Sequence, residues 1–488
     1  MRAPLALFLV AALLQLAWIA AVPFAFDWDS ATYRAVALHI IEGRGATTGA
    51  LWNLLNPAVT LPSPADLYWM PLPSRILVPA LALHPRGDQL LNALLAAGLA
   101  PLAFAFGRRL VPGRPAVAVG AALWAATGAM YARYLSIGDS VALHALLGSL
   151  GFWAMLRGRW GAATALAALA ALTRNDGFLL GIASSVGLLF REERDTSDGV
   201  SRKSMYHQFF DNTWGVVSLL QVSAPAVVAL LSYCAWQLRN AALVPGWWEQ
   251  RWALSRVLHL SQLIRGDLSP VGWGERLSYL AHSLPPITAM VWCLVLPFPA
   301  IFRLGRLTTG AWRGVLFYWL ALPLAGWVLA PAIFAEGSFF RSSSALFPIA
   351  CVLAVEGLFK MSERFPRYHP YFLPVLAGAG ILGLQLGVGP LGRMGKEPFS
   401  PSDCAPLAAL PPGEVVFSNH PPFVETLCGR SAVILPSGLD VVAVQHLAQH
   451  HGIRTALIRG QQGPGGAPKP ELLLPGWVEV EPGFWRAP

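Results

Sequence analysis

Charged side chains are scarce in this sequence. Asp, Glu, Lys and Arg make up 12% of the 488 residues, whereas hydrophobic residues make up 55%, and the mean hydropathy is +0.51. Soluble globular domains carry roughly 25% charged residues, so about half of the charge expected for a water-facing surface is missing. This shortage excludes an ordinary soluble protein and indicates a protein of the membrane.

Sequence motifs of several common enzyme classes are also absent. The chain contains no Walker-type phosphate loop, Gly-x-Ser-x-Gly elbow, His-Glu-x-x-His motif or Cys-x-x-Cys pair. ATP-driven transport and serine or zinc hydrolysis therefore lose their usual sequence support. The formal net charge is +9, but the arginines are scattered in short loops between apolar runs and form no basic stripe. We therefore expect no nucleic-acid partner.

Apolar runs long enough to cross a bilayer dominate the first 390 residues. A spanning helix needs about 20 apolar residues. The first run has no clear cleavage site, so we interpret it as an uncleaved span. Lys and Arg in alternate short loops place the N-terminus in the cytoplasm, and about eleven spans then place the C-terminus outside. The predicted spans are 3–22, 88–106, 115–132, 140–156, 160–173, 177–190, 216–237, 284–301, 315–334, 344–359 and 370–390.

Two polar regions are predicted on the extracytoplasmic side. The first is the loop 23–87, in which Tyr33, Val36 and Ile40 share one face of a helix predicted over 30–42, with Gly43 suited to end it. A second short helix is predicted over 75–83.

The second polar region follows residue 390. Strand-like runs at 415–418, 432–435 and 455–458 alternate with helical stretches at 422–427 and 441–451, which is typical of a small α/β domain. We therefore divide the chain into a transmembrane domain, 1–390, and an extracytoplasmic α/β domain, 391–488. Cys404 and Cys428 lie in the second domain, where an oxidising compartment would permit a disulfide.

Acidic residues stand at the predicted outer edge of the membrane. Asp27 and Asp29 precede a predicted helix, so that Asp29 or Ser30 is suited to cap it. The alternative is that the two carboxylates activate a hydroxyl acceptor or bind a divalent cation. Asp139 lies in the tight connection before the fourth span, as a cap or as a functional carboxylate. Both acidic sites are predicted to open on the same side.

Basic residues on that side offer partners for an anion. Arg341 precedes the tenth span, where it is suited either to contact lipid headgroups or to pair with a phosphate. The outside loop 239–283 holds further arginines despite the positive-inside rule, which leaves them available for an anionic ligand. Arg174 and Asp176 form a predicted outside turn, which we interpret as an ion-paired hairpin.

Four passages together resemble a known family. They are the acidic residue and Tyr at 29–33, running on to the Gly-ending helix at 41–45; the Pro-Leu segment at 68–72; Asp139; and the turn at 172–177. In this order they are similar to GT-C glycosyltransferases, in the branch of protein O-mannosyltransferases and lipid A aminoarabinose transferases. The chain departs from the family at Ser30, where Glu is frequent, and at Met70, where Lys is frequent.

The resemblance implies a polytopic α-helical membrane protein of GT-C-like fold with an extracytoplasmic tail. It implies transfer of a sugar from a polyprenyl-phosphate donor to a glycan, lipid or protein hydroxyl, with inversion, at the outer face of the inner membrane. No cofactor is implied with certainty; Asp27 and Asp29 would bind a divalent cation if one is used. Because Met70 replaces the Lys, the donor phosphate needs another partner, such as Arg75, Arg341 or the 251–276 arginines.

The resemblance also implies roles for individual residues. Asp29 is the expected general base and Asp139 the second catalytic carboxylate. The expected substrate-binding residues are Asp27, Tyr33, Tyr68, Arg75 and Arg341. Two other classes of function stay open: a transporter or flippase of lipid-linked sugars, which would place its carboxylates near mid-membrane, and a non-catalytic surface protein, which would have no polar cavity beneath the first loop.

Overall fold

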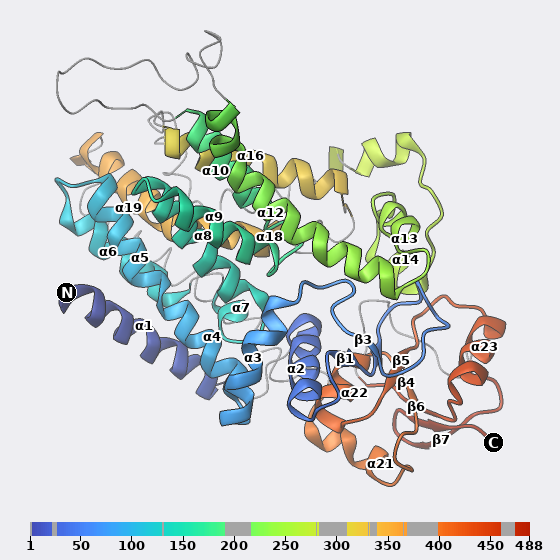
Figure 1. Ribbon diagram of the computed structural model, residues 1–488. Coiled ribbons are helices and arrows are strands. Elements are labelled where there is room, and N and C mark those ends of the chain that lie inside the picture. The colour runs from blue at the N-terminus through green and yellow to red at the C-terminus, as the bar shows by residue number, and fades with distance from the viewer. Residues whose placement is uncertain are drawn as a thin grey trace.

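Long helices form the larger part of the molecule. The computed structural model describes residues 2–21, 27–128, 131–190, 216–279, 281–282, 310–329, 331, 339–364, 366–367, 399–459 and 474–488. The predicted spans 284–301 and 370–390 lie outside these residues. The helical body consists of α1 (Arg2–Ala21), α4 (Gly87–Ala97), α5 (Leu99–Leu110), α6 (Pro115–Thr127), α7 (Ala132–Leu135), α8 (Ser140–Leu156), α9 (Trp160–Ala171), α10 (Leu179–Leu189), α12 (Val216–Leu243), α16 (Gly310–Leu329), α18 (Phe339–Ser343) and α19 (Phe347–Arg364) (Figure 1).

Four helical stretches are long and apolar enough to cross a membrane by length and composition. They are Arg2–Ala20, Gly87–Leu110, Leu219–Leu243 and Phe339–Arg364. Shorter apolar helices, among them α6, α8, α9 and α10, lie within other predicted spans. The apolar character of these segments agrees with the sequence, while the total of about eleven spans stays a prediction.

The outer helices of the body expose apolar side chains. Leu5 and Leu13 on α1 are 60% and 67% exposed, and Leu220 and Leu231 on α12 are each 62% exposed. Soluble proteins rarely expose large contiguous apolar patches. A lipid environment accounts for these faces, because the helical backbone satisfies its own hydrogen bonds and hydrocarbon favours the leucines.

Small residues set the close packing inside the body. A methyl group added to Gly148 on α8 would lie 2.4 Å from Cβ of Ala345, in the short helix η4 (Ser344–Leu346). The neighbouring Ser149 hydroxyl donates a hydrogen bond of 2.9 Å to the carbonyl of Ala345. Small residues allow helices in membranes to approach in this way. This contact fixes the start of α19 against α8.

The first polar loop contains the two predicted helices and three short strands. Helix α2 (Trp28–Ile41) ends before Gly43, which has a φ of +74°, and α3 (Leu72–Leu83) begins three residues earlier than predicted. The strands are β1 (Thr47–Thr48), β2 (Ala50–Leu51) and β3 (Ser63–Pro64). Two further helices, α13 (Trp247–Leu254) and α14 (Leu260–Arg265), lie in the later loop 239–283.

The C-terminal residues form a sheet with helices between some of its strands. Three of these strands lie where the sequence predicted them. They contain η6 (Pro401–Cys404), α21 (Ala405–Ala408), β4 (Val416–Ser418), α22 (Pro421–Cys428), β5 (Ala432–Ile434), α23 (Val441–His451), β6 (Thr455–Leu457), β7 (Val478–Glu481) and β8 (Phe484–Arg486). Strand β4 pairs in parallel with β5 and β6, and β8 pairs antiparallel to both β6 and β7. A disulfide joins Cys404 to Cys428.

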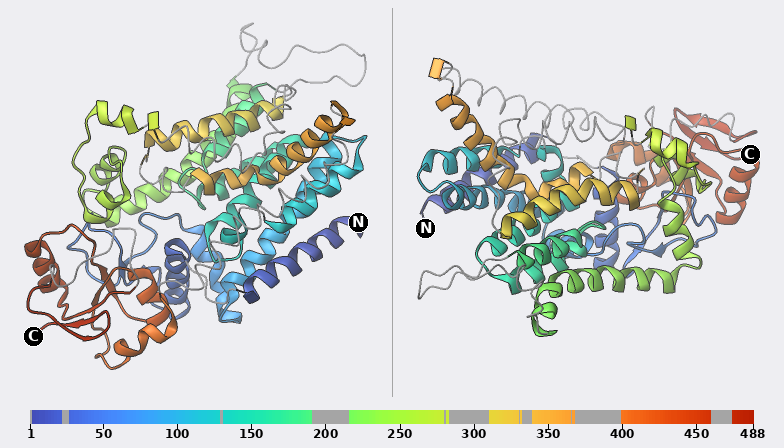
Figure 2. Two further views of the ribbon diagram at one scale, coloured as in Figure 1. Left: turned by 180° about the vertical axis from the view of Figure 1, so that it is seen from behind. Right: turned by 90° about the horizontal axis from the view of Figure 1, so that it is seen from above.

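The first loop and the C-terminal region share this sheet. Strand β2 of the loop pairs in parallel with β5, so the strand order is β2-β5-β4-β6-β8-β7. The C-terminal region lies at one end of the helical body, with α2 beside it (Figures 1 and 2). The proposed division at residue 390 lies outside the described residues, and the domain boundary and the sidedness of this region stay predictions.

Candidate active site

Two aspartates, Asp27 and Asp29, lie at the beginning of α2. Asp27, rather than the expected Asp29 or Ser30, is the N-cap: its Oδ1 accepts a hydrogen bond of 2.8 Å from the Ser30 amide. The Ser30 hydroxyl in turn accepts one of 2.8 Å from the Asp27 amide, which completes a reciprocal capping pair. Asp29 lies in the first turn and is therefore not needed as the cap.

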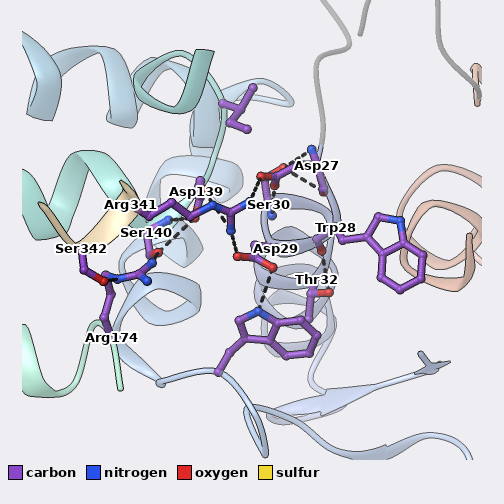
Figure 3. A network of polar contacts seen from close by, with 12 residues as sticks. Asp27, Trp28, Asp29, Ser30, Thr32, Asp139, Ser140, Arg174, Arg341 and Ser342 are labelled. Carbon is purple, nitrogen blue, oxygen red and sulfur yellow. Dashed lines mark hydrogen bonds and ion pairs between the residues drawn. The ribbon is translucent and has the colours of Figure 1, made fainter. Parts of the chain in front are cut away.

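Three carboxylates that are distant in sequence meet at Arg341. Its guanidinium forms an ion pair of 2.9 Å with Asp27 through Nη2, a second with Asp29 through Nη1, and lies 3.6 Å from Oδ2 of Asp139. Figure 3 shows the guanidinium between the three acidic side chains. The structure thus brings Asp27, Asp29 and Asp139 together around Arg341, while their opening on the extracytoplasmic side stays a prediction.

The three carboxylates differ in their access to solvent. The side chain of Asp29 is 23% exposed, that of Asp27 is 9% exposed and that of Asp139 is fully buried. Burial raises the pKa of Asp139, and the nearby Asp27 carboxylate raises it further, while Arg174 and Ser140 oppose the rise. Only Asp29 is thus placed to meet a substrate arriving from outside the cluster.

Neighbouring side chains hold the cluster in place. The Trp69 indole donates a hydrogen bond of 3.0 Å to Oδ1 of Asp29, and the Asn92 amide donates one of 3.0 Å to the backbone carbonyl of Asp139. Arg174 donates to the hydroxyls of Ser140 at 3.3 Å and Ser342 at 3.2 Å, the residues that follow Asp139 and Arg341.

Arg174 makes contacts beyond the ion-paired turn that was predicted for it. It lies 3.3 Å from Asp176, as expected for the hairpin, but its side chain is only 9% exposed and it bridges α8 to α18. Trp69 and Arg174 lie within two of the passages that resemble the GT-C family, 68–72 and 172–177. No local pattern in the sequence indicates their hydrogen bonds to distant residues.

The predicted tyrosines occupy different places. Tyr33 is 3% exposed, and burial raises its pKa well above 10, with Asp139 adding to the rise and Arg174 opposing it. It therefore borders the cluster as a neutral phenol. Tyr68 packs its ring against Trp52 and Trp247, with centroids 5.3 Å and 5.7 Å away, and lies in an aromatic group beside Trp69.

Arg75 lies apart from the carboxylate cluster. It forms an ion pair with Asp66 and donates a hydrogen bond of 2.7 Å to the Ser74 hydroxyl. Asp66 is 3% exposed, and its burial raises its pKa although Arg75 opposes the rise. Arg75 therefore already balances a buried acid.

A large cavity opens beside the segment that carries Arg341. It has a volume of about 1070 Å³ and is bounded by α10, α12, α13, α16 and the segment 270–276. Phe339 and Ser342 form part of its wall, on either side of Arg341. Most of the lining is apolar, and the arginines that line it are Arg251, Arg256 and Arg276.

These three arginines are not committed to acidic partners. No carboxylate in the described parts of the chain forms an ion pair with Arg251, Arg256 or Arg276. Arg251 donates to the Tyr233 hydroxyl at 3.1 Å, and Arg276 donates to the Ser255 carbonyl at 2.6 Å. Their charges are thus available to an anion that enters the cavity.

Comparison with solved structures identifies the class of fold. No family model and no curated protein matches the chain. It is similar to ArnT from Cupriavidus metallidurans, solved bound to undecaprenyl phosphate, with a TM-score of 0.50 and 13% identity over 91% of this chain and 87% of that one. It is also similar to the Archaeoglobus fulgidus oligosaccharyltransferase in complex with Zn and sulfate, with a TM-score of 0.49 and 12% identity over 93% of this chain and 67% of that one.

The chain therefore has the fold of membrane GT-C glycosyltransferases, and the resemblance read from the sequence is confirmed at the level of the fold. At 13% identity the likeness extends to the fold alone, and activity has to be argued from the site.

Proposed function

We propose that this protein is a membrane glycosyltransferase that moves a sugar from a polyprenyl-phosphate donor to a hydroxyl acceptor at the extracytoplasmic face of the inner membrane. The observation that carries the proposal is that one short helix, α18, connects two features: its Arg341 contacts the partly exposed carboxylate of Asp29, and its Phe339 and Ser342 line an apolar cavity of about 1070 Å³ that also contains arginines. A lipid-linked sugar phosphate needs both an apolar groove for its tail and cations for its phosphate.

The cavity is suited to the donor. The apolar side chains from α12 and α16 would contact the polyprenyl chain, and Arg251, Arg256 and Arg276 would bind the phosphate. These arginines are better placed for that role than Arg75 or Arg341, which are paired with carboxylates. Phosphate contacts by Arg75 and Arg341 stay predictions of the sequence.

The proposed reaction uses Asp29 as the base. The acceptor oxygen attacks the anomeric carbon as its proton passes to the Asp29 carboxylate, and the bond between that carbon and the phosphate oxygen breaks. The electron pair leaves on the polyprenyl phosphate, whose growing charge the cavity arginines stabilise. Attack from the side opposite the phosphate inverts the anomeric carbon. Asp139 and Asp27 orient Asp29 through Arg341.

The position of the carboxylates weighs against a transporter. Asp27 caps α2, Asp139 precedes α8 and Arg341 lies in α18 near the start of the long stretch Phe339–Arg364. The sequence places these residues at the outer edge of the membrane, whereas transporters bind their substrates near mid-membrane. The alternative of a non-catalytic surface protein predicts no polar cavity beneath the first loop, and the cavity beside α18 does not test it, because it is mostly apolar and lined by other segments.

Substitution of Asp29 tests the proposal. Asp29→Asn keeps the size of the side chain and its contact with Trp69 but removes the base, so transfer should fall on the order of 10²- to 10⁴-fold. Release of polyprenyl phosphate from a panel of lipid-linked sugars, in proteoliposomes with mixed acceptors, measures this loss.

Asp267→Asn, which changes a partly exposed aspartate of the loop 239–283, serves as the matched control and should transfer at the rate of the unchanged protein. Near-normal transfer by Asp29→Asn would exclude Asp29 as the base. Normal membrane insertion of both variants shows that folding is not the cause.

A further inference from the structure

Each of the three carboxylates directs one oxygen toward Arg341. Each uses Oδ2 toward the guanidinium: Asp27 at 2.9 Å, Asp29 in direct contact and Asp139 at 3.6 Å. Three acidic side chains from α2 and from the turn before α8 thus surround one cation. In the sequence they are separated from Arg341 by 314, 312 and about 200 residues.

The other oxygen of each carboxylate is held by a neutral donor. Oδ1 of Asp27 accepts from the Ser30 amide at 2.8 Å, Oδ1 of Asp29 accepts from the Trp69 indole at 3.0 Å, and Oδ1 of Asp139 accepts from the Ser140 hydroxyl at 3.0 Å. Donors that hold one oxygen of each carboxylate fix the direction of the other. The cluster is therefore organised around a single positively charged position.

The segment that carries Arg341 is held on both sides. The Tyr131 hydroxyl donates a hydrogen bond of 3.1 Å to the carbonyl of Phe340, and the Tyr318 hydroxyl donates one of 3.1 Å to the carbonyl of Ser342. The guanidinium also lies over the Tyr134 ring, 4.9 Å from its centroid. These contacts keep the guanidinium at the shared position.

A divalent cation does not fit this arrangement alongside Arg341. Such a cation needs several carboxylate oxygens at 2.0–2.6 Å, and the oxygens that converge here already face the guanidinium. Among the residues that the structure describes, no three His, Cys, Asp or Glu side chains are arranged to hold a metal ion.

We propose that Arg341 is the built-in cation of this carboxylate cluster and takes the position that a divalent cation would otherwise occupy. It is a positioning residue: it neutralises part of the acidic charge and orients Asp29, and sugar transfer then requires no divalent cation. This inference rests on the proposed function for its catalytic consequence, but the occupancy of the cluster by Arg341 is testable without any assay of transfer.

Binding of Mn²⁺ to the purified full-length protein tests the inference. The unchanged protein should bind no Mn²⁺ at the cluster, measured by electron paramagnetic resonance. Arg341→Ala leaves the three carboxylates around an empty position, and they should acquire about one Mn²⁺ site per chain by closing in on the ion, because they are not arranged to hold a metal ion as they stand. The added change Asp29→Asn should remove this site. Arg341→Lys, which retains a cation, should acquire none.

Arg75→Ala is the matched control, since it frees only the single carboxylate of Asp66 and should acquire no site. Mn²⁺ binding by the unchanged protein that Asp29→Asn abolishes would overturn the inference, as would a folded Arg341→Ala that acquires no site. If Arg341→Ala does not fold, Mn²⁺ binding by the unchanged protein still tests the inference. Transfer that persists after chelation supports the inference, and transfer that chelation abolishes and Mn²⁺ restores refutes it. Failure of transfer with every donor would count against the proposed function alone.

Discussion

A buried acid joins the first loop to the C-terminal sheet. Glu425 on α22 is 6% exposed and accepts hydrogen bonds from the Gly49 amide and from the Thr48 hydroxyl, the latter at 2.8 Å. Nε2 of His39 lies 3.3 Å from it, and burial lowers the pKa of His39, which favours the neutral ring. Burial raises the pKa of Glu425 from 4.5 to about 7, although these hydrogen bonds oppose the rise.

The stability of this contact should therefore fall as the pH rises. Between 4.5 and about 7 the folded state holds a proton on Glu425 that the opened state releases, so raising the pH favours opening. A shift from 4.5 to about 7, at about 1.4 kcal/mol for each pH unit, corresponds to about 3 kcal/mol, or on the order of a hundredfold in protection. Glu425→Gln removes the titrating group and should remove this dependence.

Amide hydrogen exchange of residues 47–52, corrected for the intrinsic effect of pH, measures the opening. Protection in the unchanged protein should decline from pH 5 to pH 7.5, and protection in Glu425→Gln should stay level. Glu414→Gln, at a glutamate that accepts a hydrogen bond from Thr455 on the inner strand β6, is the control and should retain the decline. An equal decline in Glu425→Gln would show that Glu425 is not the titrating group.

Two further predictions concern the cavity and the disulfide. Arg251→Ala removes a cation from the cavity wall and should weaken donor binding about 10- to 100-fold, as expected for a charge-assisted hydrogen bond. Arg265→Ala, in the same loop but away from the cavity, should leave the KM for the donor unchanged; equal effects of the two variants would contradict the assignment. Cys404→Ser opens a link between residues 24 apart and should lower the free energy of unfolding of the C-terminal region by about 3 kcal/mol. Urea unfolding followed by limited proteolysis measures this loss, and an unchanged midpoint would show that the link contributes little.

Local patterns in the sequence were sufficient to predict many elements. The spacing of Tyr33, Val36 and Ile40 placed a helix over 30–42, and α2 covers Trp28–Ile41. The β-branched runs around 416, 433 and 456 predicted three strands that the structure contains. Such patterns work because helix and strand periods are local properties of the chain.

Local sequence patterns did not predict the contacts between distant segments. Strand β2 is two residues long and pairs with β5, with Ala50 opposite Ala432, and no turn or spacing connects these segments. Arg341 was recognised as a candidate ligand of phosphate, but its pairing with Asp27 and Asp29 depends on how α18 packs against α8 and α16. The cap was assigned to Asp29 or Ser30 because the sequence alone did not reveal the reciprocal bonds of Asp27 and Ser30.

The proposed glycosyltransferase transfers a sugar from a polyprenyl phosphate, whereas a transporter would move the lipid-linked sugar across the membrane. Proteoliposomes loaded with polyprenyl phosphate carrying a labelled sugar, with hydroxyl acceptors outside, separate the two. If the protein is a glycosyltransferase, the label leaves the lipid and joins an acceptor with the opposite anomeric configuration. Label that stays on the lipid but becomes accessible on the other side of the bilayer would contradict this function and establish a transporter.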